Sequence, residues 1–195
     1  MKIVFLVLLA VLFALQGKSQ ELDSIKKTLV DGIVELGLFE ERIYQFKNTK
    51  LPEFHLLDLK GLLIDSKDFH GKPMVIYFWF SSCEPCIEEL PVLNALAEEF
   101  KGQISFLAIT FESRSTVQKF LEKRKFQFQH LVDAKQYIKE FGMFGYPKTL
   151  VIDSEQNIVE ILKMMPKQED LPKSVQRAEF FKKQFETVFN RLFNN

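Results

Sequence analysis

The sequence has only two cysteines among 195 residues, so a small domain stapled by several disulfides is excluded. It has no excess of either charge, with 26 basic and 26 acidic side chains. A nucleic-acid-binding surface normally leaves a basic excess, so this balance argues against a nucleic-acid partner. No internal repeat, low-complexity tract or long linker suggests a second domain. These absences favour one ordinary globular domain.

Apolar residues, by contrast, are abundant. Hydrophobic side chains make up 47% of the sequence, and 21 residues are phenylalanine. This much apolar material can offset the conformational entropy lost on folding, which argues against intrinsic disorder. The chain is also long enough to bury a single core.

The first residues have the pattern of a secretory signal peptide. Lys2 precedes an apolar run of 13 residues, Ile3–Leu15, which is too short to span a bilayer comfortably. Gly17 and Ser19 then place small residues at the minus-three and minus-one positions of a cut after Ser19. We therefore expect residues 1–19 to be a cleaved signal peptide, with an uncleaved membrane anchor as the alternative.

Cleavage would set both the charge and the compartment of the mature protein. The leader contains two lysines and no acid, so 24 basic and 26 acidic groups would remain. We expect export to the periplasm or cell envelope of a bacterium, where disulfides persist. No stable membrane insertion is expected after cleavage.

The mature chain divides into three parts. Residues 20–50 carry apolar side chains three and four positions apart and are expected to be helical. Residues 51–165 alternate strand-like and helix-like stretches, which predicts an α/β sandwich containing a parallel pair of strands. Residues 166–195 contain a long amphipathic helix, Ser174–Phe193. Its aromatic face is expected to pack on the domain, and a partner or dimer surface is the alternative.

One motif, Cys83-Glu84-Pro85-Cys86, combines residues that can carry chemistry. It follows a buried strand, Met74–Phe80, and begins a helix. Unpaired N–H groups and the positive dipole end at a helix start favour a thiolate on Cys83. Cys86 lies one turn further on and is expected to point into the helix–sheet contact, while Cys83 stays exposed. The pair can close a disulfide, and the exposed member can attack another one.

Two other interpretations of the cysteine pair compete with this one. Half a zinc site would need a second ligand pair, but the three histidines, His55, His70 and His130, are scattered. A static structural disulfide would usually close a longer loop. We therefore expect no metal and no cofactor.

Three further features accompany the cysteine motif. Phe78-Trp79 precedes it, Pro91 lies five residues after Cys86, and Gly145-Tyr146-Pro147 follows about sixty residues later. With these features the sequence resembles the thioredoxin superfamily, and most closely its exported TlpA-like thiol–disulfide oxidoreductases in the redoxin or AhpC-TSA-like group. The resemblance covers about Leu51–Leu162. Pro91 stands where the family has its helix proline, and Gly145-Tyr146-Pro147 stands where it carries its cis-proline loop.

The resemblance implies a thioredoxin-like three-layer sandwich, a central mixed sheet flanked by helices. An N-terminal hairpin and extra N- and C-terminal helices are expected around it. In this family Cys83 would be the attacking thiolate and Cys86 the resolving thiol. Five further residues around the two cysteines are expected to contact the substrate: Tyr146, Pro147, Trp79, Glu84 and Pro85.

A third catalytic residue is implied by the same resemblance. Glu89 lies three residues after Cys86, where the exported branch has a glutamate that assists proton transfer with the buried cysteine. The alternative is a solvated helix glutamate. The sequence also departs from the thioredoxins, because Tyr77 replaces their buried aspartate and Ser82 replaces a common tryptophan.

The expected function is reduction of disulfides in exported proteins or a haem-maturation partner. A membrane thiol donor would recharge the enzyme, which we expect to be a monomer. One alternative is a peroxiredoxin-like peroxidase, but Phe80 and Ile76 occupy the positions of its Thr and Pro. Another is a non-catalytic binding module with an inert disulfide.

Overall fold

The structure, a computed structural model, describes residues 42–194. The expected signal peptide and most of the expected helical segment 20–50 lie outside the described residues. The end of that segment forms a short 3-10 helix, η1 (Arg42–Phe46). None of the described helices is both long and apolar enough to cross a membrane.

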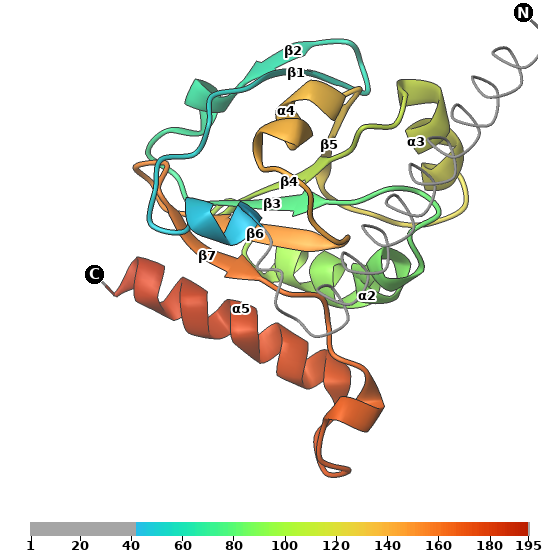
Figure 1. Cartoon of the computed structure of the whole chain (residues 1–195), viewed down its shortest axis with the longest axis vertical. Coiled ribbons are helices and arrows are strands. Elements are labelled where there is room, and N and C mark those ends of the chain that lie inside the picture. The colour runs from blue at the N-terminus through green and yellow to red at the C-terminus, as the bar shows by residue number, and fades with distance from the viewer. Residues whose placement is uncertain (1–41, 195) are drawn as a thin grey trace, which may run out of the picture. The chain divides into compact units, whose positions relative to one another are not determined.

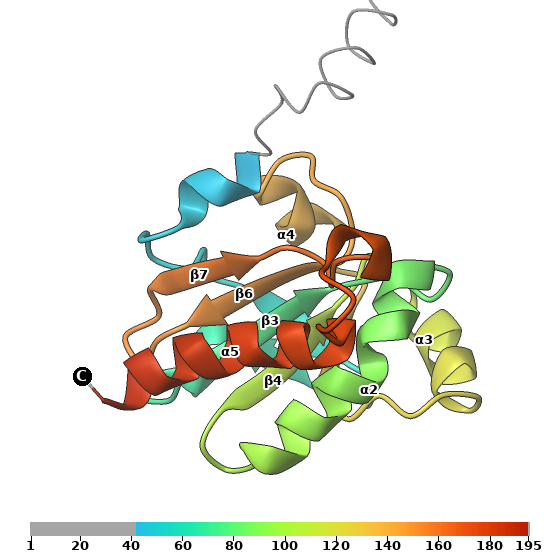
Figure 2. The same ribbon diagram turned by 90° about the horizontal axis from the view of Figure 1, so that it is seen from below.

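Seven strands form one mixed sheet, as expected (Figures 1 and 2). Their order across the sheet is β2-β1-β5-β4-β3-β6-β7. The central strands β3, β4 and β5 run parallel to one another, and the remaining neighbours are antiparallel. The strands are β1 (His55–Asp58), β2 (Leu63–Asp65), β3 (Met74–Phe78), β4 (Ser105–Ile109), β5 (Gln129–Val132), β6 (Lys148–Ile152) and β7 (Ile158–Leu162).

Helices cover both faces of this sheet. Alternate residues of a strand point to opposite faces, so Val75 and Tyr77 of β3 join one core cluster while Ile76 and Phe78 join the other. The first cluster includes residues of α2 (Glu84–Glu99), α3 (Arg114–Leu121) and α5 (Arg177–Phe193). The second includes residues of η1 and α4 (Lys135–Glu140). Two further 3-10 turns are η2 (Ser66–Phe69) and η3 (Gln168–Asp170).

The C-terminal helix α5 lies beside α2 (Figure 2), and it packs against the domain through its aromatic face. Phe181 and Phe189 are fully buried, and the Phe189 ring lies 4.8 Å from that of Phe100 at the end of α2. The helix begins at Arg177, three residues later than expected. Ala178, in its first turn, is exposed, and the buried residues of the helix begin at Phe181.

Candidate active site

The two cysteines form a disulfide at the N-terminus of α2. Cys83 is the N-cap residue, and its Cα lies 5.2 Å from that of Cys86. The Cys83 sulfur accepts a hydrogen bond of 3.3 Å from the Cys86 backbone N–H. Pro85 stands in the first turn, where its missing N–H costs no helical hydrogen bond. A sulfur in this position accepts a hydrogen bond from one of the free amides in the first turn of the helix, which favours a thiolate.

The exposure of Cys83 differs from the expectation. In the disulfide form Cys83 is 3% exposed and Cys86 is fully buried, and both belong to the apolar cluster around Trp79. The disulfide holds the Cys83 sulfur toward Cys86 and the core, which removes most of its surface from solvent. Glu84 and Pro85, between the two cysteines, are exposed and border the disulfide.

A carboxylate holds the turn that leads into the motif. The Ser81 backbone N–H and hydroxyl each donate a 2.7 Å hydrogen bond to Glu112, which follows β4. The Glu112 N–H in turn donates to the Thr110 hydroxyl. These bonds fix the two-residue approach to Cys83. Glu112 is not part of any motif with the cysteines, so nothing in the sequence indicates that it contacts this turn.

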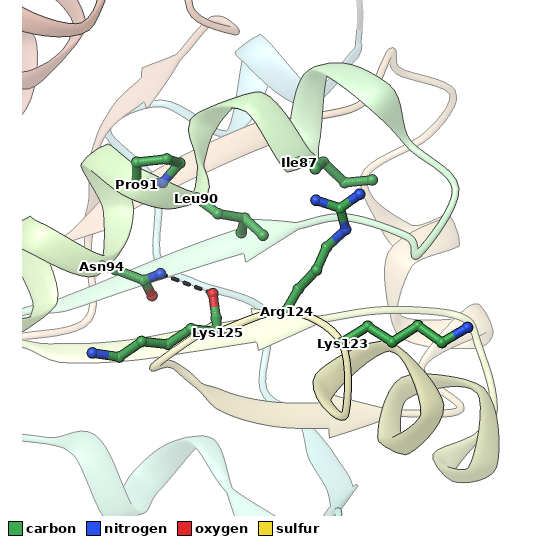
Figure 3. A pocket seen from close by; sticks show the side chains of 7 residues that line it. All are labelled: Ile87, Leu90, Pro91, Asn94, Lys123, Arg124 and Lys125. Carbon is green, nitrogen blue, oxygen red and sulfur yellow. Dashed lines mark hydrogen bonds between the residues drawn. The ribbon is translucent and has the colours of Figure 1, made fainter.

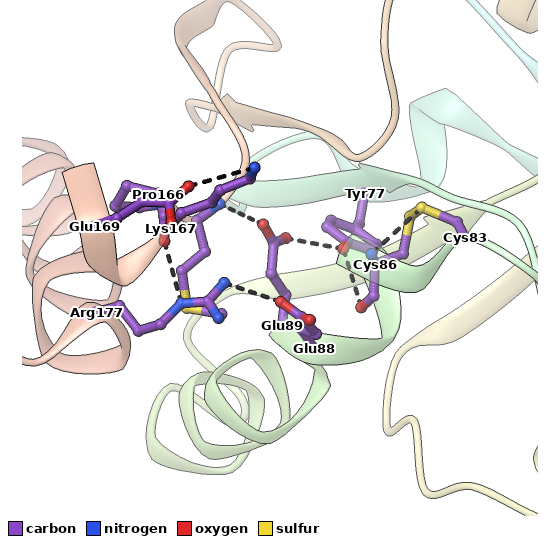
Figure 4. Close-up of polar contacts among 10 residues, drawn as sticks. Tyr77, Cys83, Cys86, Glu88, Glu89, Pro166, Lys167, Glu169 and Arg177 are labelled. Atoms are coloured by element: carbon purple, nitrogen blue, oxygen red, sulfur yellow. Dashed lines mark hydrogen bonds and ion pairs between the residues drawn. A yellow bond between two sulfur atoms is a disulfide. The ribbon is translucent and has the colours of Figure 1, made fainter.

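Glu89 lies in the core beneath the disulfide, on the inner face of α2 (Figure 4). Its side chain is 1% exposed, so the solvated alternative is wrong. One carboxylate oxygen accepts a 2.8 Å hydrogen bond from the Tyr77 hydroxyl, and the other accepts one from the backbone N–H of Met165. Glu88, its neighbour, points outward and pairs with Arg177 at 2.9 Å.

Burial has the largest effect on the pKa values of Glu89 and Tyr77. It raises the pKa of Glu89 from an ordinary 4.5 to about 7, although the bonds from Met165 and Tyr77 act in the opposite direction. Burial also raises the pKa of Tyr77 well above 10, and the nearby Glu89 charge adds to the effect. Glu89 can therefore gain or lose a proton near neutral pH while Tyr77 keeps its own.

Tyr77 is a site residue that the sequence analysis did not identify. Its hydroxyl bridges Glu89 and the Cys86 carbonyl oxygen, which it approaches to 3.3 Å. In the sequence it is only a departure from the thioredoxin pattern. The alternation of β3 could have found it, because residues 75, 77 and 79 share the face that α2 covers.

The segment between β7 and α5 closes this site from the other side (Figure 4). Met165 is buried and donates its backbone N–H to Glu89. Arg177 donates from its side chain to the Pro166 carbonyl at 3.1 Å and to Glu88 at 2.9 Å. The start of α5 is thereby tied to the active-site helix.

The Tyr146–Pro147 peptide bond is cis, as the resemblance implied. The Tyr146 ring packs edge-on against Phe80, with centroids 5.3 Å apart, and lies 6.1 Å from the Phe111 ring. Tyr146 also lines an apolar cavity of about 600 Å³ beside α4. Phe111 and Met143, both exposed, line it as well. An accessible apolar surface therefore begins at this loop.

Trp79 does not lie on that surface. Its side chain is fully buried, and its ring packs against Phe120, Phe126 and His130. The expectation that Trp79 contacts substrate is therefore wrong, because this residue belongs to the face covered by α2 and α3. Among the described residues, no group of three histidine, cysteine or acidic side chains is arranged to hold a metal ion.

Comparisons with known proteins agree with this geometry. The model of the AhpC/TSA family matches residues 48–161. The chain is 28% identical over 119 residues to the thioredoxin-like protein YneN of Bacillus subtilis, covering 59% of this chain and 70% of that protein. It is 28% identical over 130 residues to the thiol-disulfide oxidoreductase ResA of Bacillus cereus, covering 65% and 75%.

A solved structure shows the same fold. The thioredoxin domain of a thiol-disulfide oxidoreductase of Bacteroides vulgatus superimposes with a TM-score of 0.55 at 25% identity. The match covers 60% of this chain and 89% of that one. The fold and the disulfide thus define a thioredoxin-like thiol–disulfide oxidoreductase of the TlpA/ResA-like group. The chain belongs to the AhpC/TSA family.

Proposed function

We propose that the protein is an exported reductase of disulfides in cell-envelope proteins. The observation that supports this most is the Cys83–Cys86 disulfide at the N-terminus of α2, with Glu89 buried behind it. Such a site joins an activated sulfur to a proton acceptor that titrates near neutral pH. Export rests on the leader-like sequence of residues 1–19.

The reaction begins from the reduced protein. The Cys83 thiolate attacks one sulfur of the substrate disulfide, forming a mixed disulfide, and the other substrate sulfur leaves as a thiolate that takes a proton from water. The Cys86 thiol then gives its proton to Glu89 and attacks Cys83. The second substrate sulfur is released, and the Cys83–Cys86 disulfide forms. Two electrons pass from the protein to the substrate, and a thiol donor restores the dithiol.

Tyr77 would hold Glu89 in place through both protonation states. Its hydroxyl has one proton and two neighbouring acceptors, Glu89 and the Cys86 carbonyl. When Glu89 is ionised, Tyr77 donates to the carboxylate. When Glu89 is protonated, Glu89 can donate to the Tyr77 oxygen, and Tyr77 can donate to the Cys86 carbonyl. The proton can thus enter and leave without an unpaired buried group.

The substrate chain would bind along the cis-proline loop. The Tyr146 backbone can pair with an extended segment in the manner of an added strand. A neighbouring apolar side chain of the substrate would enter the cavity beside α4, lined by Phe111 and Met143. Pro147 would hold the loop, while Glu84 and Pro85 would contact the substrate from the helix side.

Trapping of mixed disulfides tests this function. Wild-type protein should reduce insulin disulfides in the presence of a thiol donor, and Cys83→Ser should abolish the reaction. Cys86→Ser should accumulate mixed disulfides through Cys83, because the resolving thiol is gone. An inert disulfide would give no insulin reduction, and a peroxidase would consume hydrogen peroxide faster than insulin. Faster alkylation of Cys86 than of Cys83 in the reduced protein would reverse the assigned roles.

A further inference from the structure

A second cavity, of about 340 Å³, lies along the outer side of the active-site helix (Figure 3). Its apolar wall consists of Ile87, Leu90 and Pro91 of α2. These residues are three and four positions apart and share one helix face. The Ile87 backbone N–H donates to the Cys83 carbonyl at 3.1 Å, so the wall begins one helical turn after the attacking cysteine. The cavity therefore begins one helical turn from the reactive end of α2.

The opposite wall carries three consecutive cations. Lys123, Arg124 and Lys125 are exposed residues between α3 and β5, and all three line the cavity. None of them forms an ion pair with an acid among residues 42–194, and the exposed Glu122 beside them is likewise unpaired there. In Figure 3 the Arg124 side chain extends toward Ile87. In the same view Lys123 and Lys125 extend to either side of Arg124, so the apolar wall faces one guanidinium group flanked by two lysines.

The basic segment is fixed to α2 by one side chain. The Asn94 amide nitrogen donates to the Lys125 carbonyl at 2.9 Å, and the Asn94 amide oxygen accepts from the Gln127 N–H at 2.8 Å. Asn94 lies three residues after Pro91, on the same face of α2. Its two bonds use only backbone atoms of the segment, so the cationic side chains remain available to a ligand.

We infer that this cavity binds an acidic, partly apolar segment of the protein whose disulfide is exchanged at Cys83. The inference rests on the proposed function and adds a substrate preference to it. Carboxylates of the segment would pair with the cations, and an apolar side chain would cover Ile87 and Pro91, the accessible apolar residues of the wall. A phosphate or other small anion would leave that apolar wall uncovered, which favours a polypeptide.

Helix geometry sets where the acids must lie in such a substrate. With a rise of about 1.5 Å per residue, the cavity extends from roughly 6 to 16 Å beyond Cys83 along α2. An extended chain advances about 3.3 Å per residue. Acidic residues about two to five positions from the reacting substrate cysteine would therefore reach Arg124 and its neighbours.

Two synthetic peptides test the inference. Both carry a cysteine in a disulfide with a fluorescence-quenching thiol and a leucine three residues away; one has two glutamates beside the leucine, and the other has two glutamines. Stopped-flow fluorescence with the reduced protein should show about tenfold faster reduction of the glutamate peptide at low ionic strength. High salt should abolish the preference, because it screens exposed charges.

Charge variants locate the effect. Lys123→Gln/Arg124→Gln/Lys125→Gln should reduce both peptides at equal rates, because no cation of the cavity remains to pair with the glutamates. The matched control Lys72→Gln/Lys101→Gln/Lys183→Gln removes the same charge away from the cavity and should retain the preference. Circular dichroism should show that both variants are folded.

Four results would overturn the inference. Equal rates for both peptides with wild-type protein would show that the cavity does not bind an acidic segment, while the proposed reductase function would still stand. Equal loss of preference in the control variant would assign the effect to net charge. A dimer that dissociates only in the Lys123/Arg124/Lys125 variant, seen by sedimentation, would assign the cavity to a second copy. If neither peptide is reduced, the proposed function fails as well.

Discussion

At the scale of single residues, the proposed chemistry depends on a carboxyl group that the fold keeps away from water. Glu89 is 1% exposed, and its two oxygens accept from Tyr77 and from the Met165 backbone. These two bonds do not offset the loss of solvation, so the pKa of Glu89 stays raised at about 7. The protein thus keeps the carboxyl group that we propose as the proton acceptor for Cys86 at some cost in stability near neutral pH.

Glu89→Gln should make the oxidised protein more stable at alkaline pH. The folded state holds the Glu89 proton up to about pH 7, whereas the unfolded chain releases it near pH 4.5. Wild-type stability therefore loses about 3 kcal/mol from this group as pH rises through that window, and the loss persists above it. Urea unfolding measures this effect. The free energy of unfolding of the variant minus that of wild type should be larger at pH 8 than at pH 4 by about that amount.

The matched control is Glu88→Gln, because Glu88 is half exposed and paired with Arg177. Its difference from wild type should change by less than about 1 kcal/mol over the same range. Parallel pH curves for wild type and Glu89→Gln would contradict the raised pKa.

Tyr77→Phe should shift the pH dependence of the resolving step upward. The change removes a hydrogen bond that favours ionised Glu89, so the pKa of Glu89 rises further. The release rate of a Cys83 mixed disulfide, measured across pH 5 to 9, should show its inflection at higher pH than in wild type. Tyr137→Phe is the control, since that buried hydroxyl donates to the Pro52 carbonyl in the other core cluster. An unchanged inflection in Tyr77→Phe would reduce Tyr77 to a packing residue.

At the scale of elements, α5 and the segment before it are part of the active-site architecture. The buried residues of α5 join the cluster that contains both cysteines. Lys182 also pairs with Glu99 at 2.8 Å, so the two helices are joined along their length as well as at Glu88. The C-terminal helix therefore supports α2 from the side, on the same face of the sheet (Figure 2).

Phe181→Ala should destabilise the protein by about 3 to 5 kcal/mol, as expected for a fully buried phenylalanine. Phe180→Ala, at the neighbouring position, removes a ring that is 37% exposed and should cost about 1 kcal/mol or less. Chemical denaturation of the two variants measures the difference. Equal losses would mean that α5 does not pack on the domain in solution.

At the scale of the whole molecule, the balance of charges around the disulfide decides the direction of electron flow. The helix N-terminus stabilises the Cys83 thiolate, and therefore the reduced form. Glu84 opposes this effect, and the dipeptide between the cysteines has no cationic side chain. Because these two effects oppose each other, we expect the Cys83 thiolate to be only moderately stabilised, which favours a reducing protein.

The redox potential should therefore lie nearer −270 mV, about the thioredoxin value, than −120 mV, about that of a strong oxidant. Equilibration with glutathione buffers, read by thiol alkylation, measures it. Glu84→Gln should make the potential less negative, whereas Glu88→Gln, paired with Arg177, should change it less. A wild-type potential at or above about −180 mV would favour disulfide formation or isomerisation instead.

Local patterns in the sequence were enough for the class of fold and for the reactive pair. The strands and helices follow from apolar side chains recurring at periods of two and about 3.6, which depend only on near neighbours. The cysteines lie three residues apart, so their contact at the start of α2 is also a local property. The cis bond before Pro147 followed from its place in a family pattern.

Only the tertiary structure decided what surrounds that pair. Glu89 is buried because a backbone group 76 residues away, at Met165, closes over it. Tyr77 and Trp79 both point to the face covered by α2, which makes one a partner of Glu89 and the other a core residue. Burial and long-range hydrogen bonds depend on segments far apart in the chain. No spacing within the sequence therefore encodes them directly, and they appear only once the sheet and its helices are assembled.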